Sequence, residues 1–412
     1  MGNSGTKPED VFISGDKLPS WDVCIAAIEK DPSILQCRDD SGRTPLHRAL
    51  EDKNVPDEVV SLILKHDERS SFQRDNDGFS PLHSALSHRR VSSAAGPFRT
   101  VYDINPDNSM LKSNAGQLPL HLALSNRAET EVIRKLVEAH PEGASEAFSN
   151  TFPIHIAIVA KCPQETIEIL VEHFPIGVEK KGGGGFLPIH HAVMIKPPLD
   201  YIKFLVKLHP DSLWDRTSEG KMPLHYALEK QASDEVIAFL VDSCPNAVAT
   251  IEPGGNYPLH IALEKHYSFE TVSLLVDIFP RGAAIVDAND VHPLRRALKD
   301  RFQDDVILCL LQASPEACRD VDEYERYAVH YAASRNYSDV VVNELVRLFP
   351  SAVRMCDRNG QLPLHIALVH QDNYDVIQHL VQFYPEGTLV TDDKGYLPLH
   401  YGIENKYETD VI

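Results

Sequence analysis

The feature that most constrains this chain is a proline that recurs at a nearly fixed interval. It is usually followed by Leu or Ile and then by His. From Pro153 onward the spacing is 35 residues without exception, with Ala328 once in place of proline. The recurring prolines are Pro45, Pro81, Pro119, Pro153, Pro188, Pro223, Pro258, Pro293, Pro363 and Pro398. A period of this length indicates an array of similar structural units.

Each unit begins with a turn and a short helix. A glycine usually lies three residues before the proline, as at Gly42 and Gly220, and Asn150, Asp290 or Glu325 takes that place elsewhere. Gly, Asn and Asp tolerate the positive φ that a tight turn demands, whereas Glu325 predicts a distorted copy. Proline at the first helical position loses no hydrogen bond and presets φ. A short helix is therefore expected to start at each proline.

A second helix follows, opening with acidic residues that complement the positive end of the helix dipole. In one copy, its apolar residues are Val236, Ile237, Leu240 and Val241, a helical spacing, and we expect it to stop at the next periodic proline, Pro245. The acids at these helix starts are Asp57, Glu58, Asp234, Glu235, Asp304, Asp305 and Asp375. A helix pair of this size cannot bury its apolar face alone, so the copies must stack. Stacking would align the acids into a stripe, which either only caps the helices or also binds a partner.

These units resemble ankyrin repeats, whose signature Thr-Pro-Leu-His-x-Ala is complete at residues 44–49. The resemblance spans roughly residues 18 to 412. It implies an all-α ankyrin-repeat solenoid of stacked helix-turn-helix units with turn or hairpin fingers, about 11 units in all. The period is 35 residues rather than about 33. An apolar residue such as Leu118 or Met222 usually replaces the Thr, so the Thr–His hydrogen bond is not assumed there.

The expected organisation is a flexible tail over residues 1–16 and a single solenoid over residues 17–412. Residues 17–35 read as an N-terminal half-repeat cap, and residues 87–112 as a divergent insertion. Its first part is a surface loop with or without a function, and a poor second helix is expected around Phe98 to Ile104, before Pro106. The last repeat is incomplete, because the chain ends at Ile412 where its second helix should begin.

Two adjacent copies diverge from the pattern. In the first of them, Arg295 takes the place of the repeat His, and Arg296 takes the place of the next residue, which is apolar in most copies. The next has Ala328 for proline and an unusual turn, Asp-Glu-Tyr-Glu-Arg, at residues 322–326. The pair is either a contact site or a drifted pair of repeats, and the pattern does not decide between them.

Charge and cysteine usage limit the classes of partner. The formal net charge of −20 repels nucleic acid and anionic lipid and favours a protein partner with a basic surface. The seven cysteines are scattered without a Cys-x-x-Cys pair, which argues against a disulfide framework or zinc ribbon and favours a reducing, cytoplasmic compartment. No catalytic motif is present, so we expect no enzyme activity and no cofactor.

The repeat histidines are the obvious candidates for metal ligands. Neighbouring helices lie about 8–10 Å apart, whereas zinc needs nitrogens about 2 Å from one centre. We therefore expect these histidines to be hydrogen-bonded turn residues, and no metal site. They are His47, His83, His121, His155, His190, His225, His260, His330, His365 and His400.

The N-terminus matches the pattern for N-myristoylation, Met-Gly-x-x-x-Ser/Thr, with Gly2 as the acceptor and Thr6 downstream. A chance match in a flexible tail is the competing interpretation. A single acyl chain binds membranes only marginally, with K of about 10⁴ M⁻¹. Membrane attachment therefore depends on acylation of Gly2, and would be weak, reversible and peripheral.

The leading functional hypothesis is a protein-binding scaffold or adaptor. The alternative is the regulatory or targeting portion of a larger enzyme whose catalytic domain follows Ile412. The resemblance implies that partners contact the concave face, formed by the turn tips and first helices. By position, the candidate contact residues are Arg43, Phe79, Phe186, Lys221, Glu229, Lys230, Glu264, Lys265, Arg326 and Tyr396.

Overall fold

The computed structural model describes residues 12, 20–52, 54–87, 96–335, 337–370 and 374–405. Gly2 lies outside these ranges, as does the rest of the predicted tail 1–16 except for Phe12. Residues 88–95 of the predicted insertion and the chain end at 406–412 also lie outside them. Acylation of Gly2 and an incomplete last repeat therefore stay predictions, as does a single continuous solenoid.

The chain forms two compact units, Met1–Ser212 and Leu213–Ile412. Both are built from the same pair of helices, which we call the first helix and the second helix of a copy. In unit 1 the first helices are α3 (Pro45–Glu51), α5 (Pro81–Leu86), α7 (Pro119–Ser125), α9 (Pro153–Val159) and α11 (Pro188–Ile195). Its second helices are α2 (Trp21–Lys30), α4 (Asp57–His66), α6 (Pro97–Ile104), α8 (Thr130–Ala139), α10 (Gln164–His173) and α12 (Leu199–Leu208).

Unit 2 repeats the arrangement. Its first helices are α13 (Pro223–Glu229), α15 (Pro258–Glu264), α17 (Pro293–Lys299), α19 (Ala328–Ser334), α21 (Pro363–His370) and α23 (Pro398–Glu404). Its second helices are α14 (Asp234–Ser243), α16 (Phe269–Ile278), α18 (Asp304–Ala313), α20 (Asp339–Leu348) and α22 (Tyr374–Phe383). Among the described residues, no strand is formed; one isolated bridge joins Phe148 and Thr151. The predicted all-α fold of stacked helix pairs is confirmed.

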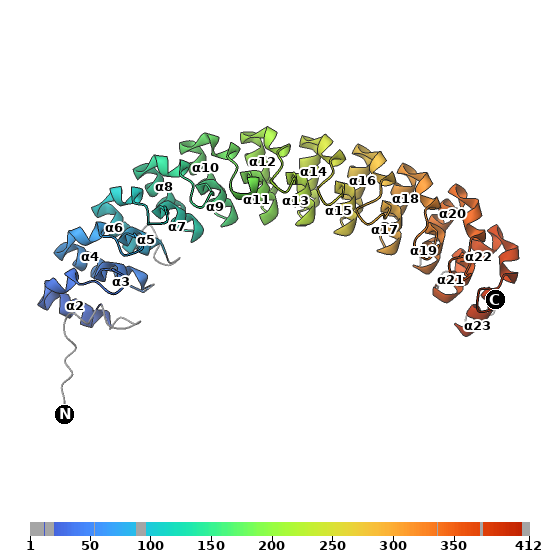
Figure 1. The fold of residues 1–412 in the computed structure, drawn as a ribbon, viewed down its shortest axis with the longest axis horizontal. Helices are drawn as coiled ribbons and strands as arrows, with labels where there is room; N and C mark the ends of the chain where they lie inside the picture. Colours follow the sequence, from blue (N-terminus) through green and yellow to red (C-terminus); the bar gives the residue numbers. More distant parts are fainter. Residues whose placement is uncertain are drawn as a thin grey trace, which may run out of the picture. The chain divides into compact units, whose positions relative to one another are not determined.

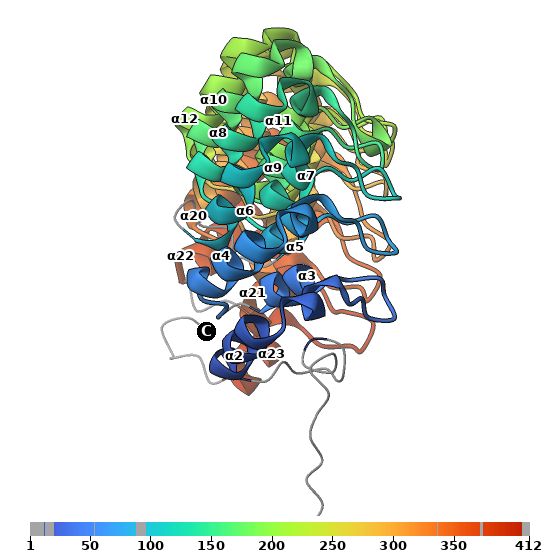
Figure 2. The same ribbon diagram turned by 90° about the vertical axis from the view of Figure 1, so that its left-hand side faces the viewer.

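Within each unit the helices form two layers. In unit 1, each first helix contacts the first helix of the next copy, from α3 through to α11, and Figure 2 shows the second helices in the neighbouring layer. In unit 2, α13 to α23 form the first-helix layer and α14 to α22 the second-helix layer (Figure 1). A seven-residue helix is far below the roughly 12–15 residues that an isolated helix needs in water, so stacking supplies the stability.

The core lies between the two layers. Val236, Ile237, Leu240 and Val241 of α14 are all 3% exposed or less, as their spacing predicts. Ala227 at the centre of α13 is fully buried, and its small side chain lets neighbouring helices approach closely. At about 25 cal/mol per Å² of apolar surface, burying each of the Val, Ile and Leu side chains of α14 contributes about 1.5–3 kcal/mol to the stability of the fold.

A short 3₁₀ helix follows each second helix, an element that the sequence pattern did not predict. The helix α14 ends at Ser243, and the periodic Pro245 opens the 3₁₀ helix η8 instead of ending α14. Ala247 and Val248 of η8 are each 1% exposed, so this turn adds to the core. The other 3₁₀ helices are η1 (Pro32–Gln36), η2 (Glu68–Phe72), η3 (Pro106–Met110), η4 (Pro141–Ser145), η5 (Pro175–Glu179), η6 (Gly183–Gly185), η7 (Pro210–Leu213), η9 (Pro280–Ala284), η10 (Pro315–Arg319), η11 (Pro350–Arg354) and η12 (Pro385–Leu389).

The N-terminal and irregular regions of unit 1 follow the same plan. Helix α2 packs against α4, which is the place of a lone second helix in a half-repeat. Within the predicted insertion, residues 97–110 form α6 and η3, and Phe98 of α6 is fully buried. The predicted second helix around Phe98 to Ile104 is therefore confirmed, and a 3₁₀ turn follows it.

The turn before each first helix needs one residue with positive φ. Glu325 adopts φ of 61°, close to the 60° of Asp290 in the preceding copy, and its N–H donates to the Asp322 carbonyl at 3.0 Å. The prediction of a distorted copy at Glu325 is wrong, because the turn is kept with a residue that tolerates this region poorly. The left-handed conformation costs such a residue roughly 1–2 kcal/mol.

Candidate protein-binding surface

The repeat histidines fix each turn to the next copy. In α7, the backbone N–H of Leu118 donates to His121 Nδ1 at 2.9 Å, and His121 Nε2 lies 2.9 Å from the Glu146 carbonyl of the following copy. With Nδ1 accepting, Nε2 carries the proton and donates. The bond to Nδ1 needs only the backbone N–H of the residue before the proline. An apolar residue such as Leu118 can therefore stand at the position of Thr44 and still make this bond.

Burial keeps the rings of three repeat histidines neutral. Desolvation lowers the pKa of His83, His155 and His330 to about 4 in each case. Seven of the ten repeat histidines join copies through a bond between Nε2 and a carbonyl of the next copy: His47, His83, His121, His155, His225, His260 and His365. Among the described residues, no group of three or more His, Cys, Asp or Glu side chains is placed to hold a metal ion.

An acidic residue lies six positions before the periodic proline, or before Ala328, in seven of the eleven copies, and it was not predicted from the sequence. Asp322 Oδ1 accepts from the N–H groups of Tyr324 at 2.9 Å and Arg326 at 2.8 Å, and Asp287, Asp357 and Asp392 bind their own turns in the same way. The signal was available, because an acid recurs at this position. Each member lies six residues before a repeat proline or Ala328: Asp39, Asp75, Glu252, Asp287, Asp322, Asp357 and Asp392.

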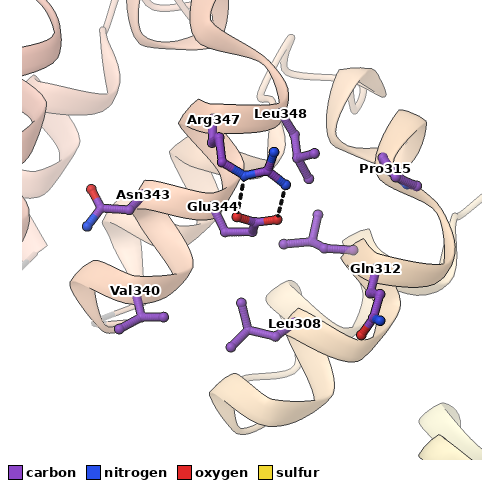
Figure 3. Close-up of a pocket in the computed structure, with 9 residues that line it drawn as sticks. Leu308, Gln312, Pro315, Val340, Asn343, Glu344, Arg347 and Leu348 are labelled. Atoms are coloured by element: carbon purple, nitrogen blue, oxygen red, sulfur yellow. Dashed lines mark hydrogen bonds and ion pairs between the residues drawn. The ribbon is translucent and has the colours of Figure 1, made fainter.

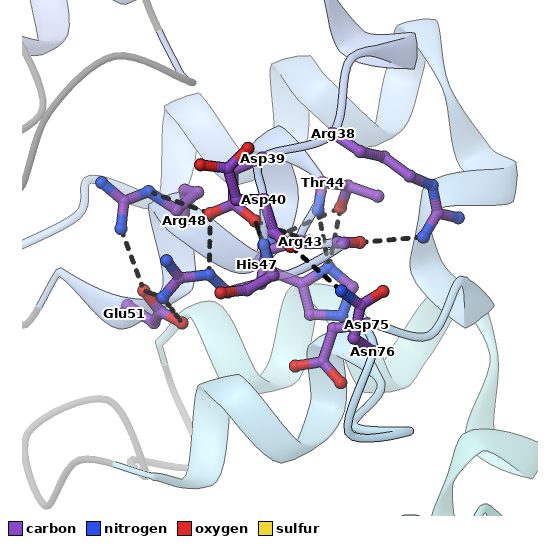
Figure 4. Close-up of polar contacts among 12 residues, drawn as sticks. Arg38, Asp39, Asp40, Arg43, Thr44, His47, Arg48, Glu51, Asp75 and Asn76 are labelled. Atoms are coloured by element: carbon purple, nitrogen blue, oxygen red, sulfur yellow. Dashed lines mark hydrogen bonds and ion pairs between the residues drawn. The ribbon is translucent and has the colours of Figure 1, made fainter.

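The first predicted contact residue, Arg43, is held in an ion-pair network in unit 1. Its Nε lies 2.8 Å from Asp39 Oδ2 and its Nη1 lies 2.9 Å from Glu51 Oε2. Arg48 reaches the same Glu51 carboxylate at 3.6 Å, so two cations and two acids neutralise one another (Figure 4). Phe79 of the next copy packs edge-on against His83 at 5.3 Å and is only partly exposed. Arg43 and Phe79 lie in the turns that precede α3 and α5, and Arg43 is already paired.

The second cluster, in unit 2, brings together two of the predicted residues. Lys221 Nζ contacts the Glu229 carboxylate closely and lies 3.6 Å from Glu252 Oε2. The Lys221 side chain is 21% exposed, and its ammonium lies 5.8 Å from the centre of the Tyr226 ring. Tyr226, which is not among the predicted contact residues, donates to Glu219 at 3.0 Å. Lys221 and Glu229 therefore form a closed internal pair.

The turn at residues 322–326 carries an arginine held between two tyrosine rings. The Arg326 guanidinium lies 4.9 Å from the centre of the Tyr324 ring and 4.7 Å from that of Tyr331. Two Arg326 nitrogens donate to Asp322 Oδ2, at 2.8 and 2.9 Å, and the Tyr331 hydroxyl donates to the same oxygen at 2.6 Å. Burial and the bond to Asp322 raise the pKa of Tyr331 to about 12. Tyr324 remains 49% exposed on this rigid support.

The remaining predicted residues are spread over separate copies. Phe186, in unit 1, stacks on His191 at 4.9 Å beside the turn at 183–185. In unit 2, Lys230 is exposed, whereas Lys265 pairs with the adjacent Glu264 at 2.8 Å. Tyr396 is 37% exposed and contacts the Tyr401 ring at 5.6 Å. Lys221 meets Glu229, and Glu264 meets Lys265, but the ten residues do not converge on one site.

The divergent Arg295 and Arg296 have structural roles. Arg295 Nη1 donates to the Val321 carbonyl of the next copy at 2.7 Å, which replaces the link normally made by the repeat histidine. Arg296 Nη2 donates to Asp287 Oδ2 at 2.6 Å, so it binds the acid of its own turn. Both arginines therefore have partners within the repeats.

A family model and a solved structure are similar to parts of this chain. The family model described as ankyrin repeats (many copies) matches residues 310–367, which include η10, α19, α20, η11 and the start of α21. No curated protein sequence matches significantly. The crystal structure of the ankyrin repeat domain of Bcl-3, a member of the IkappaB protein family, is 21% identical with a TM-score of 0.43. That match covers 57% of this chain and 99% of the Bcl-3 domain.

No described helix combines the length and the apolar character that crossing a membrane requires. Residues 310–367 match the family model directly, and the other copies repeat the same proline, histidine and helix pair in sequence and in structure. The repeats of this chain are ankyrin repeats.

Proposed function

We propose that this chain is a scaffold or adaptor that binds a partner protein through the first helices and turns of unit 2. Ankyrin repeat domains are generally protein-interaction modules and typically non-catalytic. The observation that carries the proposal is the exposed Tyr324 ring resting on Arg326, whose guanidinium is fixed by Asp322.

Aromatic and Arg side chains dominate binding energy when they are held rigid, because little side-chain entropy is lost on association. Tyr396, two copies along the same layer, is a second exposed aromatic residue that rests on another ring. The internally paired residues Lys221 and Arg326 are supports of this surface rather than its contacts.

The test is a crosslinked pull-down from native lysate with wild type and the double variant Tyr324→Ala, Tyr396→Ala. Phe383→Ala is the matched control, since Phe383 is 42% exposed and lies on the second helix α22. Charge reversal of Lys221 is unsuitable, because it would place a third carboxylate beside Glu229 and Glu252.

We expect a defined set of proteins to be captured by wild type and by Phe383→Ala, and lost from the double variant. Each anchor tyrosine is expected to supply at least about 1–2 kcal/mol of binding, so the loss should exceed tenfold. Circular dichroism checks that all three proteins are equally helical. Equal capture by the double variant would contradict binding at this surface.

A further inference from the structure

A groove runs between the second helices α18 and α20 on the side of unit 2 that faces away from the first helices. Its volume is about 580 Å³, within the range of roughly 300–1,000 Å³ that is usual for ligand pockets. Figure 3 shows Leu308 of α18 and Val340 and Leu348 of α20 around it, with the Glu344–Arg347 ion pair among these lining residues. Leu311, which is 1% exposed, also lines the groove.

Val340 departs from a rule that the other copies keep. Nine of the ten described second helices that are ten residues long have Asp or Glu as their second residue, and α20 alone has an apolar one. An acid there gains about 0.3–1 kcal/mol from the helix dipole, which Val340 forgoes. The Val340 side chain is also 55% exposed, so the core does not require it.

Leu308 is a second departure, at the facing position of α18. The fifth residue of the second helices in unit 2 is otherwise Ala238, Ser273, Asn343 or Gln378. A large aliphatic side chain appears only here, partly exposed and across from Val340. Two neighbouring helices therefore each carry an unusual apolar residue, Leu308 and Val340, and both residues line the same groove.

The charged residues that line the groove are Glu344 and Arg347, whereas the charged residues of the second helices around it are almost all acidic. The second helices of unit 2, α14 to α22, carry ten acidic residues and one basic residue, Arg347. Both Glu344 oxygens accept from Arg347, at 2.6 and 2.7 Å, so that cation is neutralised within its own helix. Exposed carboxylates at Glu270, Asp277 and Asp305 remain on this layer without a basic residue among its helices to balance them.

We propose that the α18–α20 groove binds an amphipathic helix of a partner protein, with apolar side chains flanked by Lys or Arg. Such helices use apolar anchors spaced at i, i+3 or i+4, and i+7 to fill a groove between two helices. The acidic layer attracts the basic flanks and repels nucleic acid and anionic lipid. This surface lies on the opposite layer from the proposed Tyr324 surface and is independent of it.

The probe is a phage-displayed library of helical peptides, about four turns long, selected on the full chain at low salt. Enriched peptides should carry Leu, Ile or Phe at i, i+3 or i+4, and i+7, with Lys or Arg beside them. Fluorescence anisotropy then measures the affinity of one enriched peptide for wild type and for Val340→Glu. That variant restores the residue type of the other copies, so we expect it to remain folded.

We expect Val340→Glu to weaken binding at least tenfold, and Leu308→Ser, which copies the equivalent Ser273, to do the same. Ala238→Glu adds a carboxylate to the same layer two helices away and should leave the affinity intact. The proposal is overturned if no peptide is enriched, if enriched peptides are acidic, or if Val340→Glu binds them as well as wild type. Sedimentation velocity showing a dimer that Val340→Glu dissociates would also overturn it, because a second copy would then occupy the groove.

Discussion

The second-helix layers of the two units share a fold but differ in charge. In unit 1, helices α2 to α12 carry eleven acidic and seven basic residues, whereas α14 to α22 of unit 2 carry ten acidic residues and one basic residue. Basic residues such as Arg134 and Lys203 pair with acids on unit 1, at 3.0 Å from Glu165 and 3.9 Å from Asp200. Packing therefore fixes the buried positions of the second helices in both units, whereas their exposed positions can vary in charge and so determine which partners bind.

The interior should respond alike in both units. Leu136 of α8 and Leu310 of α18 are each the seventh residue of a second helix and are 1% and 0% exposed. We expect Leu136→Ala and Leu310→Ala each to lower the free energy of unfolding by about 2–5 kcal/mol through lost burial and a cavity. Urea unfolding with hydrogen exchange recorded for each unit measures this. A cost below about 1 kcal/mol in only one unit would break the claim of a shared interior.

Acid should also weaken both units. The folded pKa of His83, in unit 1, and of His330, in unit 2, is about 4, below the ordinary value of about 6.5. Between these values the unfolded chain binds more protons, so stability falls as pH drops below about 6.5. Each histidine should cost about 2 kcal/mol of unfolding free energy at pH 5 relative to neutral pH.

Gln at either position keeps a side-chain acceptor and donor but does not titrate. His83→Gln and His330→Gln should therefore each flatten the pH dependence of unfolding by that amount, measured by urea titration at pH 5 and 7. If acid loosened one unit only, or if the Gln variants kept the full pH dependence, the buried neutral histidines would not be the cause.

The surface, in contrast, should respond differently in the two units. Reversing Glu270, Asp277 and Asp305 to Lys is expected to weaken binding of the basic peptide by roughly tenfold, because exposed charges contribute a few tenths of a kcal/mol each. The effect should shrink in 0.5 M salt through screening. The matched control reverses Glu58, Glu165 and Asp200, exposed acids on the second helices of unit 1, to Lys. It changes the net charge by the same amount and should not weaken binding. An equal loss of peptide affinity in both variants would contradict the claim that the second-helix layers of the two units differ in binding.

The fold was predictable from sequence because each copy repeats its constraints. Proline, the residue at positive φ and the apolar spacing of residues such as Val236 and Leu240 recur often enough to predict the helix pair. The 3₁₀ helices were missed, because five residues such as those of η8 are too short for a periodic pattern. The intact turn at Glu325 was also missed, since hydrogen bonds to Asp322 over-ride the residue's own preference.

The surface was harder to predict, because a side chain's partners lie in other parts of the turn or in the next copy. Arg43, Lys221 and Arg326 looked like free contact residues in sequence, yet each is bound to an acid of its own turn or helix. The departure at Val340 was visible in the aligned copies. Its meaning needed the structure, which places Leu308 of the neighbouring helix beside it.

The central claim, that departures from the repeat pattern on one layer create a binding site, is tested most directly by hydrogen–deuterium exchange of the full chain. Exchange is compared with and without a basic amphipathic peptide from the selection. We predict slower exchange in α18 and α20 of wild type, no change in α8 and α10, and no protection anywhere in Val340→Glu. Protection that appears in α8 and α10, or that persists in α18 and α20 of Val340→Glu, would contradict the account.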